Sequence, residues 1–319
     1  MKRSLMSGRV VVIGAGNVGA TIAYTILMSD LTSEIVMIDV NEEKARGEVL
    51  DMNHGLAYFK QVSIRFGSYE DCAHADAIII TAGIGRKPGQ TRLELAQINA
   101  GIIQDITKNI MKHAQNPLIL VVSNPVDVLT YIVQQESGLP AGRVFGSGTT
   151  LDTARFKYLL SQECKIDVRN IHAYIVGEHG DSEVPLWSHA NVAGKPIEEF
   201  CEDDTSPHHL DKEKVFQATK NSGAEIIRLK GATFYGIGMS VARIIGCIVG
   251  NECAVLTVST TLDGQYGIHD VALSLPCIIG SHGVERYMDI KMSPDELQRL
   301  RESAGKLRES IAQVYPAKQ

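Results

Sequence analysis

Residues 10–19 read Val-Val-Val-Ile-Gly-Ala-Gly-Asn-Val-Gly, and this stretch decides the fold of the 319-residue chain. An apolar run with strand character, residues 9–13, leads directly into a G-x-G-x-x-G loop, and a helical pattern over residues 20–28 follows it. A glycine loop alone is a weak signal, but one that joins a strand to a helix is typical of dinucleotide-binding sites. The stretch therefore predicts such a site near the start of the chain.

The three glycines of this loop have separate physical roles. Gly14 would permit the tight turn, Gly16 would let the backbone approach a pyrophosphate, and Gly19 would let the helix pack on the strand. The helix that begins here would also offer free N–H groups and the positive end of its dipole to the phosphates.

Asp39 indicates which dinucleotide is bound. It lies at the end of the next apolar run, residues 34–40, about 20 residues past the glycines. Its carboxylate would hydrogen-bond a ribose diol and repel a 2′-phosphate, so we predict NAD rather than NADP. An acid that only caps a turn is the alternative, and the agreement of loop, strand, helix and acid disfavours it.

The rest of the first half repeats the alternation of strand and helix. Apolar runs recur at residues 77–82 and 118–123, which predicts buried parallel strands with crossover helices. Residues 93–111 predict one amphipathic helix, because apolar side chains recur there near helical spacing, at Leu95, Ile98, Ile102, Ile106 and Ile110. Together these elements predict an α/β fold with a Rossmann-type, doubly wound parallel sheet.

The second half mixes helices with strands that hairpins would connect. Helical patterns begin near residue 151 and cover residues 212–230 and 234–251, and Ser293-Pro294 is a start signal for a last helix. Strand-like runs lie at residues 171–177, 253–260, 271–279 and 284–290. This predicts an α+β catalytic domain over residues 148–319, after an NAD-binding domain over residues 1–147, with the boundary near Gly148.

The composition excludes several classes of partner. Hydrophobic residues make up 44% and charged residues 21%, and the net charge is −6. Nucleic acids and anionic membranes bind basic surfaces, so neither is an expected partner. No stretch approaches the roughly 20 apolar residues that span a bilayer, and the first apolar run is too short for a signal peptide. We therefore expect a cytoplasmic protein.

The cysteines follow no metal-binding or disulfide pattern. None forms a C-x-x-C pair, so the spacing indicates neither a zinc site nor a disulfide framework. We expect no metal, and we expect reduced and mostly buried thiols at all six positions, which are Cys72, Cys164, Cys201, Cys247, Cys253 and Cys277.

Four motifs together closely resemble the bacterial L-lactate dehydrogenases, within the lactate/malate dehydrogenase family. They are Ser123-Asn124-Pro125-Val126-Asp127, Leu151-Asp152-Thr153-Ala154-Arg155, Gly177-Glu178-His179-Gly180-Asp181-Ser182 and Lys230-Gly231-Ala232-Thr233. The resemblance covers almost the whole chain, from Val10 to the last helix. It implies reversible, NADH-dependent reduction of a 2-keto acid to an L-2-hydroxy acid.

The resemblance implies three catalytic roles that the chemistry supports. His179 would donate the proton in reduction and accept it in oxidation, because imidazole titrates near neutrality. Asp152 would orient the imidazole and favour its protonated form. Arg155, three residues further on a helix and so on the same side, would grip the substrate carboxylate with its planar fork. A loop histidine bonded to backbone is the alternative for His179.

Residues 82–93 resemble the mobile substrate loop of this family. Glycines and a proline interrupt a connection from strand to helix, as a hinged lid requires. Arg92 would close onto the ketone oxygen and stabilise its developing negative charge, and Asn124 would donate a further hydrogen bond to that oxygen. The alternative for Arg92 is a solvated residue at a helix start, where a cation is mildly unfavourable. Thr233 is expected in the substrate pocket with Asp152 and Arg155.

The resemblance also implies the remaining cofactor contacts. Beside the three glycines and Asp39, the residues expected to contact NAD are Val18, Lys44, Tyr69, Gly83, Asn124 and Ser147.

Arg86 leaves the choice of substrate open. At this loop position the best-known lactate enzymes carry Gln, whereas malate dehydrogenases carry Arg, which pairs with the second carboxylate of oxaloacetate. Glu178 and Thr233 look lactate-type, and some bacterial lactate dehydrogenases also have Arg-Lys-Pro-Gly here. An unpaired Arg86 sealed in a closed site with pyruvate would cost several kcal/mol, so the lactate interpretation needs Arg86 to stay solvated or to find another acid. We favour pyruvate, with oxaloacetate as the alternative.

Lys157 and His172 match the positions at which bacterial lactate dehydrogenases bind fructose 1,6-bisphosphate. The usual residue at the first position is Arg, and Lys157 keeps the charge but weakens a bidentate phosphate grip. A surface lysine and a strand-end histidine are the alternative. The family is typically homotetrameric, and the long apolar pattern over residues 237–249 agrees with a need for a partner face.

Two other classes of protein are disfavoured. A non-catalytic dinucleotide-binding module would have no reason to keep Asp152, Arg155 and His179 together. A metal-dependent NAD enzyme such as a glycosidase would need a Cys/His pair near the cofactor, and the sequence shows no such cluster.

Overall fold

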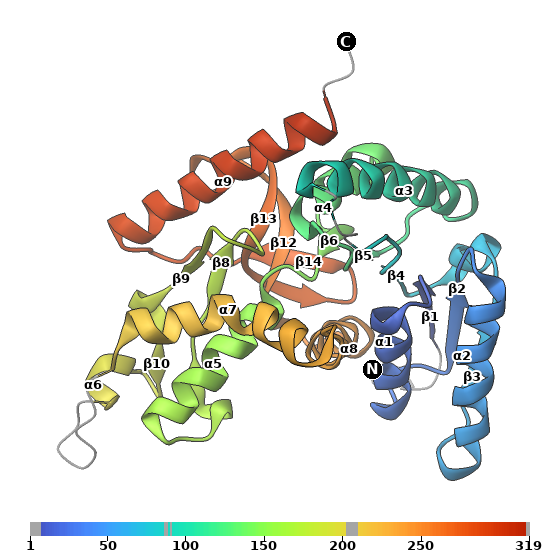
Figure 1. Cartoon of the computed structure of the whole chain (residues 1–319), viewed down its shortest axis with the longest axis horizontal. Coiled ribbons are helices and arrows are strands. Elements are labelled where there is room, and N and C mark those ends of the chain that lie inside the picture. The colour runs from blue at the N-terminus through green and yellow to red at the C-terminus, as the bar shows by residue number, and fades with distance from the viewer. Residues whose placement is uncertain (1–7, 86–88, 90, 202–209, 317–319) are drawn as a thin grey trace.

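The computed structural model describes residues 8–85, 89, 91–201 and 210–316 (Figure 1). Six parallel strands of the first half form one end of its main sheet, in the order β3-β2-β1-β4-β5-β6. They are β1 (Arg9–Ile13), β2 (Glu34–Ile38), β3 (Ser63–Phe66), β4 (Ala77–Ile80), β5 (Ile119–Val121) and β6 (Val144–Gly146). This order is that of a Rossmann fold, which confirms the predicted doubly wound sheet.

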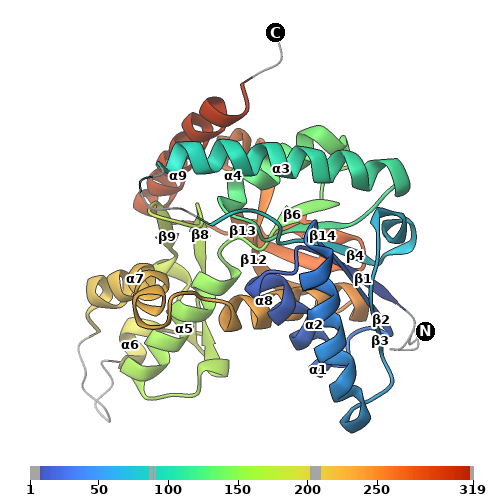
Figure 2. The same ribbon diagram turned by 45° about the vertical axis from the view of Figure 1, so that its right-hand side comes forward.

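Helices cover both faces of this sheet, as its apolar strands require. Figure 2 shows α3 (Arg92–His113) and α4 (Val126–Ser137) on one face, and α1 (Asn17–Met28) and α2 (Glu42–Gly55) on the other. Two short 3-10 helices, η1 (Leu56–Tyr58) and η2 (Tyr69–His74), lie in the connections. Strands buried on both sides explain why β4, β5 and, after Arg9, β1 read as unbroken runs of Val, Ile, Leu and Ala.

The long helix predicted over residues 93–111 forms, but its buried face is partly different. Ile106 and Ile110 are buried as expected, and Ile103 joins them, whereas the side chain of Ile98 is 44% exposed. The helix begins with a capping box in which the hydroxyl of Thr91 accepts from the N–H of Glu94, whose carboxylate accepts from the N–H of Thr91. Such a cap fixes where the preceding loop ends.

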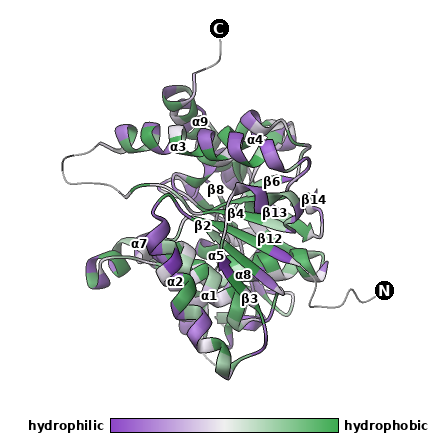
Figure 3. Cartoon of the chain, turned by 90° about the vertical axis from the view of Figure 1, so that its right-hand side faces the viewer, coloured by the Kyte–Doolittle hydropathy of each residue, from purple (hydrophilic) through white to green (hydrophobic). Residues whose placement is uncertain are grey.

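The second half continues the same sheet. Its strands β8 (Ile175–Gly177), β9 (Glu183–Pro185), β12 (Ala254–Asp263), β13 (His269–Gly280) and β14 (Gly283–Tyr287) are antiparallel. The junction is the pairing of Ser259 in β12 with Gly146 in β6. The two predicted halves therefore share one 11-stranded sheet, whose strands are mostly hydrophobic in Figure 3.

A second, smaller sheet corrects one predicted strand. The run over residues 171–177 is divided into β7 (Ile171–His172), which pairs with β10 (Asn191–Val192), and β8 in the main sheet. β10 also pairs with β11 (Lys195–Pro196). Ala173 and Tyr174 lie between β7 and β8 and carry the chain from one sheet to the other.

Five α-helices lie in the described residues of the second half, most of them where the sequence predicts. They are α5 (Thr150–Cys164), α6 (Ile197–Cys201), α7 (Lys212–Lys230), α8 (Tyr235–Gly250) and α9 (Pro294–Val314), with the 3-10 helices η3 (Val168–Asn170), η4 (Trp187–His189) and η5 (Gln265–Gly267). Ser293 caps α9 as predicted, in a capping box with Glu296. Within the described ranges no helix is both long enough and apolar enough to cross a membrane.

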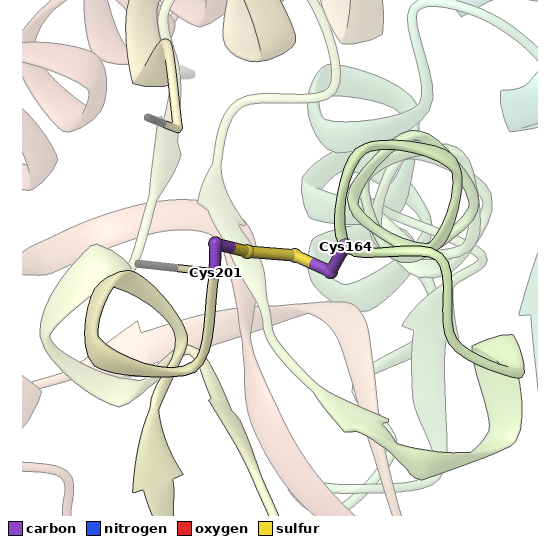
Figure 4. Close-up of a disulfide and its surroundings, with 2 residues drawn as sticks. All are labelled: Cys164 and Cys201. Atoms are coloured by element: carbon purple, nitrogen blue, oxygen red, sulfur yellow. A yellow bond between two sulfur atoms is a disulfide. The ribbon is translucent and has the colours of Figure 1, made fainter. Parts of the chain in front are cut away.

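The expectation of six reduced cysteines is wrong for two of them. Cys164 at the end of α5 and Cys201 at the end of α6 form a disulfide, with Cα atoms 5.4 Å apart (Figure 4). Their sequence separation of 37 matches none of the spacings considered in the sequence, and the packing of α6 against α5 brings the sulfur atoms together. Cys253 is exposed rather than buried, and the described part of the chain holds no cluster that could bind a metal.

The disulfide should contribute measurably to stability. In the loop-entropy model, a bridge between cysteines separated by 37 positions lowers the conformational entropy of the unfolded chain. This stabilises the folded state by about 4 kcal/mol. We expect Cys201→Ser to lower the free energy of unfolding by up to about that amount, measured by denaturant unfolding without reductant. The exposed Cys253→Ser is the matched control and should change it little. Identical unfolding of the wild type with and without reductant would contradict this expectation.

Candidate active site

The residues expected to bind a dinucleotide gather at one edge of the sheet. Each follows a different parallel strand, and the carboxyl ends of parallel strands meet at the same edge, where α/β proteins bind their ligands. In strand order from β1 to β6 these residues are Gly14, Asp39, Tyr69, Gly83, Asn124 and Ser147.

The glycine loop has the shape that a pyrophosphate needs. Gly14 has φ +111°, and a Cβ there would lie 2.6 Å from Oγ1 of Thr81. A Cβ at Gly16 would meet no protein atom within 4 Å, so this space is open to a ligand. A Cβ at Gly19 would collide with the carbonyl oxygen of Gly14, because α1 packs closely on the turn. The residues present therefore fit the phosphates of NAD at the start of α1.

Asp39 connects β2 to the glycine loop. Its Oδ2 accepts a hydrogen bond from the N–H of Ala15 at 2.5 Å, and its Oδ1 accepts from the N–H of Asn41 at 2.8 Å. Of the other expected contacts, Val18 packs against the core, Lys44 is exposed in the first turn of α2, and Ser147 is buried. The carboxylate of Asp39 thus holds the glycine loop in place, beside the positions expected for the ribose and the pyrophosphate of NAD.

Three of the expected catalytic residues contact one another. His179 lies in the loop between β8 and β9, and its Nδ1 is 2.5 Å from Oδ2 of Asp152. Nη1 of Arg155 donates to Oδ1 of the same carboxylate at 2.9 Å. Asp152 and Arg155 lie one turn apart on α5, in the same-side arrangement that their spacing predicts. One buried carboxylate thus orients both the imidazole and the guanidinium.

Mutual attraction sets the charges of this cluster. Burial opposes protonation of His179, but the charge and hydrogen bond of Asp152 raise its pKa to about 9. Burial alone would raise the pKa of Asp152, but His179 and Arg155 hold it below its ordinary value. The favoured state is therefore an imidazolium next to a carboxylate, with Nδ1 committed to the acid and Nε2 left to act on a substrate.

A cavity of about 670 Å³ adjoins this cluster. Asn124 and His179 both line it, together with the starts of α3 and α4 and the end of α9. Thr233 is half-buried between α7 and α8 and makes no hydrogen bond to the three contacting residues in the described part of the chain. Arg92 is the first residue of α3, but its side chain, like all of Arg86, lies outside the described residues.

Two buried acids near His179 were not predicted from the sequence. Asp127 in α4 accepts a hydrogen bond from the backbone N–H of His179 at 2.7 Å, and burial raises its pKa to about 6. Burial, and next the charge of Asp152, raise the pKa of Glu183 in β9 to about 8. A single acid in an otherwise apolar run, such as Asp127 between Val126 and Val128, is the signal that could have drawn attention to α4.

A second cavity, of about 440 Å³, contains the two residues expected to bind a sugar bisphosphate. Lys157 and His172 line it, and Arg169 and Arg243 also lie on its wall. Burial lowers the pKa of Lys157 below its ordinary value. Arg243 forms an ion pair with Glu252, and Arg169 with Asp167. Four basic side chains therefore line one cavity.

Comparison with known proteins identifies the family. The model described as the NAD-binding domain of lactate/malate dehydrogenase matches residues 8–146, and that of the α/β C-terminal domain matches residues 149–317. The chain belongs to the lactate/malate dehydrogenase family. It is accordingly an NAD-dependent oxidoreductase.

Relatives of similar length are named lactate dehydrogenases. An L-lactate dehydrogenase from Acetivibrio thermocellus is 47% identical over 98% of this chain and 98% of its own length. L-lactate dehydrogenase 1 from Clostridium acetobutylicum is 46% identical over 96% of this chain and 98% of its own length. Among solved structures, a lactate dehydrogenase from a Medee basin deep-sea metagenome superposes with a TM-score of 0.94 at 42% identity, over 98% and 99%. The minor L-lactate dehydrogenase of Enterococcus mundtii, in its ligands-bound form, superposes with a TM-score of 0.92 at 46% sequence identity. The match covers 97% of this chain and 98% of that one.

Two glycine substitutions should separate binding from folding. Gly16→Ala should leave the melting temperature nearly unchanged but weaken NADH binding at least about tenfold, because its methyl group occupies space that only a ligand needs. Gly19→Ala should lower the melting temperature, because its methyl group collides with Gly14. Both are measured by thermal unfolding and fluorescence titration with NADH. Gly47→Ala is the control, because Gly47 is exposed on α2 and a Cβ there would meet no atom within 4 Å. Equal NADH affinities of the Gly47→Ala and Gly16→Ala variants would contradict the assignment of the Gly16 loop as the pyrophosphate site.

Proposed function

We propose that this protein is an L-lactate dehydrogenase that reversibly reduces pyruvate to L-lactate. The observation that carries the proposal is the sharing of one buried carboxylate, Asp152, by an imidazole and a guanidinium beside a cavity. Similarity over almost the whole chain to proteins named L-lactate dehydrogenase supports it.

The residues at the glycine loop and the strand ends would hold NADH. When bound, NADH supplies a hydride to the keto carbon of the substrate. His179 donates a proton from Nε2 to the keto oxygen in reduction and takes it back in oxidation. Asp152 holds the ring through Nδ1 and stabilises its protonated form, as the acid of a catalytic triad does.

Binding and polarisation of the substrate need further groups. Arg155 holds the substrate carboxylate with its planar fork. Asn124, on the wall of the cavity that contains His179, donates to the keto oxygen, and Arg92 stabilises negative charge on that oxygen. Thr233 contributes to the pocket wall.

Malate dehydrogenase activity is the second candidate, because Arg86 is the residue that malate enzymes carry at this position. The names of the relatives favour pyruvate. Arg86→Gln tests the alternative directly: if the ratio of the rates on pyruvate and oxaloacetate stays unchanged, Arg86 does not select the substrate.

The first assay is oxidation of NADH with pyruvate and oxaloacetate in parallel. We expect a larger kcat/KM for pyruvate. Because reduction consumes the proton of His179, whose pKa is about 9, its rate should fall as the pH rises through that value, while lactate oxidation should increase. His179→Asn should lower kcat for both directions by about 10²–10⁴. A larger kcat/KM for oxaloacetate would make the protein a malate dehydrogenase.

We further propose activation by fructose 1,6-bisphosphate at the second cavity, where Lys157 and His172 lie with two arginines. Two phosphates carry several negative charges, and a lysine and two guanidinium groups provide matching cations, with a histidine as a further hydrogen-bonding group. Lys157 forms no ion pair within the described residues, and burial lowers its pKa, so a phosphate beside it would stabilise its charged form, which favours binding.

Adding fructose 1,6-bisphosphate should shift the pyruvate saturation curve to lower concentrations. Lys157→Ala should raise the activator concentration needed at least about tenfold, while the exposed Lys108→Ala on α3 serves as control. A saturation curve that does not respond to the activator would contradict the proposal.

A homotetramer and a cytoplasmic location complete the proposed function. The tetramer is supported by large apolar side chains exposed around the junction of α7 and α8, namely Ile227, Leu229, Tyr235 and Met239. Such side chains are common in surfaces that another subunit covers. The cytoplasmic location follows from the proposed use of NADH and pyruvate as shared cellular metabolites.

A further inference from the structure

We propose that Glu183 is a positioning residue that makes binding of the substrate carboxylate depend on a proton. As a neutral acid it leaves Arg155 available to hold that carboxylate, and as an anion it attracts Arg155 and repels the substrate. The inference rests on the proposed function, because the carboxylate in question is that of the 2-keto acid.

The strand β9 directs Glu183 toward α7. Successive side chains of a strand point to opposite faces, and Val184 packs in the main hydrophobic core. Pro185, on the same face as Glu183, lines a cavity together with Phe216 of α7. α7 in turn packs against α5, the helix that carries two of the catalytic residues (Figure 1). The side chain of Glu183 therefore points to the place where β9 and these two helices meet.

The charged groups around Glu183 come from two helices and one loop. Those whose charge acts on it are Asp152 and Arg155 of α5, Lys220 of α7, and His179 in the loop before β9. The same loop holds two further acids, Glu178 and Asp181. The carboxylate of Glu178 turns away to accept from the N–H and the hydroxyl of Ser182. Glu183 thus lies within the field of the whole catalytic cluster.

The carboxyl of Glu183 is buried without a matching donor. The residue is 7% exposed, and its Oε1 has no hydrogen-bond partner in the described part of the chain. The two permanent cations that act on it bond other groups. Arg155 donates to Asp152 at 2.9 Å, and Lys220 donates to the carbonyl oxygen of Asp181 at 2.7 Å. A buried acid in this position is more stable neutral than charged, because an unpaired buried charge costs far more than an unpaired polar group.

Two effects keep this acid protonated near neutral pH. Burial, and next the negative charge of Asp152, raise the pKa of Glu183 to about 8, against the attraction of the nearby cations. A substrate carboxylate held by Arg155 would add another anion to this group and raise that pKa further. Binding of substrate and protonation of Glu183 therefore favour each other.

The anionic form of Glu183 should affect binding rather than the reaction itself. Above a pH of about 8, the substrate must enter beside a buried anion or bring a proton with it, and both weaken binding. Once the substrate is bound, Glu183 is neutral again and His179 acts as before. The loss should therefore raise KM and leave kcat largely unchanged.

Glu183→Gln is the decisive variant, because it keeps the size of the side chain and removes its ionisation. We measure kcat and KM for pyruvate against pH at saturating NADH. For the wild type we expect KM to rise about tenfold from about pH 7 to about pH 9, as one ionisation near 8 requires. For the variant we expect about twofold, the part due to His179, which titrates at about 9. At about pH 7 the kcat values should agree within about twofold, because Gln replaces a neutral acid.

Thermal unfolding measures the same ionisation without any reaction. The pKa of Glu183 in the folded protein lies above its ordinary value of 4.5, so the stabilisation from its bound proton is complete below that value. It is lost as the pH rises to about 8. We expect the melting temperature of the wild type to fall relative to that of Glu183→Gln over this range and to level off above it.

Glu296→Gln is the matched control. Glu296 on α9 is also a buried acid, and burial alone would raise its pKa, but bonds from Ser188 and Ser293 hold the pKa below its ordinary value. Its contribution to stability has the opposite sign, since it is present above the ordinary pKa and lost as the pH falls. The pyruvate KM of this variant should follow the wild-type profile.

Each outcome decides the question. A wild-type KM that stays constant from about pH 7 to about pH 9 would overturn the inference, and so would an equal rise of KM in Glu183→Gln. A difference in melting temperature that does not change with pH would also overturn it. If Glu183→Gln fails to fold, the KM profile of the wild type decides alone. A wild type that reduces no 2-keto acid would refute the proposed function, whereas an active wild type with a constant KM would refute this inference only.

Discussion

A buried carboxylate is stable only when hydrogen-bond donors or cations contact both of its oxygens. Asp152 is such a carboxylate, and the rest of the site is arranged around this requirement. Its two oxygens bond His179 and Arg155. These bonds need the first turn of α5 to face the loop between β8 and β9. Three threonines hold that turn: Thr149 and Thr150 donate to carbonyl oxygens of β8 and β12, and Thr153 accepts from the N–H of Ile175. The active-site geometry is therefore continuous with the hydrogen bonding of the sheet.

The turn that leads into α5 shows how closely the two halves are joined. Gly148 has φ +49°, and a Cβ there would lie 2.5 Å from the backbone N of Ser259 in β12. The N–H of Thr149 donates to the hydroxyl of Ser274 in β13 at 3.0 Å. A larger residue at this position would displace the start of α5 and with it Asp152. The position near which the sequence places a domain boundary is thus a tightly packed turn between strands that belong to one sheet.

The sequence predicts the elements whose signals are local. Residues 9–13 form β1 as predicted, and residues 212–230 form α7, because an unbroken apolar run and a long helical period are both readable in one window. β3 and β6 escape prediction because Ser63–Phe66 alternates polar and apolar residues and Val144–Gly146 is three residues long. The contact of Asp152 with Arg155 follows from helical spacing, whereas the contact of Asp127 with His179 and the disulfide of Cys164 with Cys201 depend on tertiary packing that no window contains.

The two halves of the chain meet at one imidazole. Asp127 belongs to the helix after β5 and bonds the backbone of His179, while Asp152 belongs to α5 and bonds its ring. Burial lowers the pKa of His179, but both acids raise it, so acids from both halves favour the protonated ring. β12 joins the halves through its pairing with β6, and a change in that pairing would alter the distance between the two acids. The environment that favours a protonated His179 therefore depends on the joined sheet, because each half contributes one of the two acids.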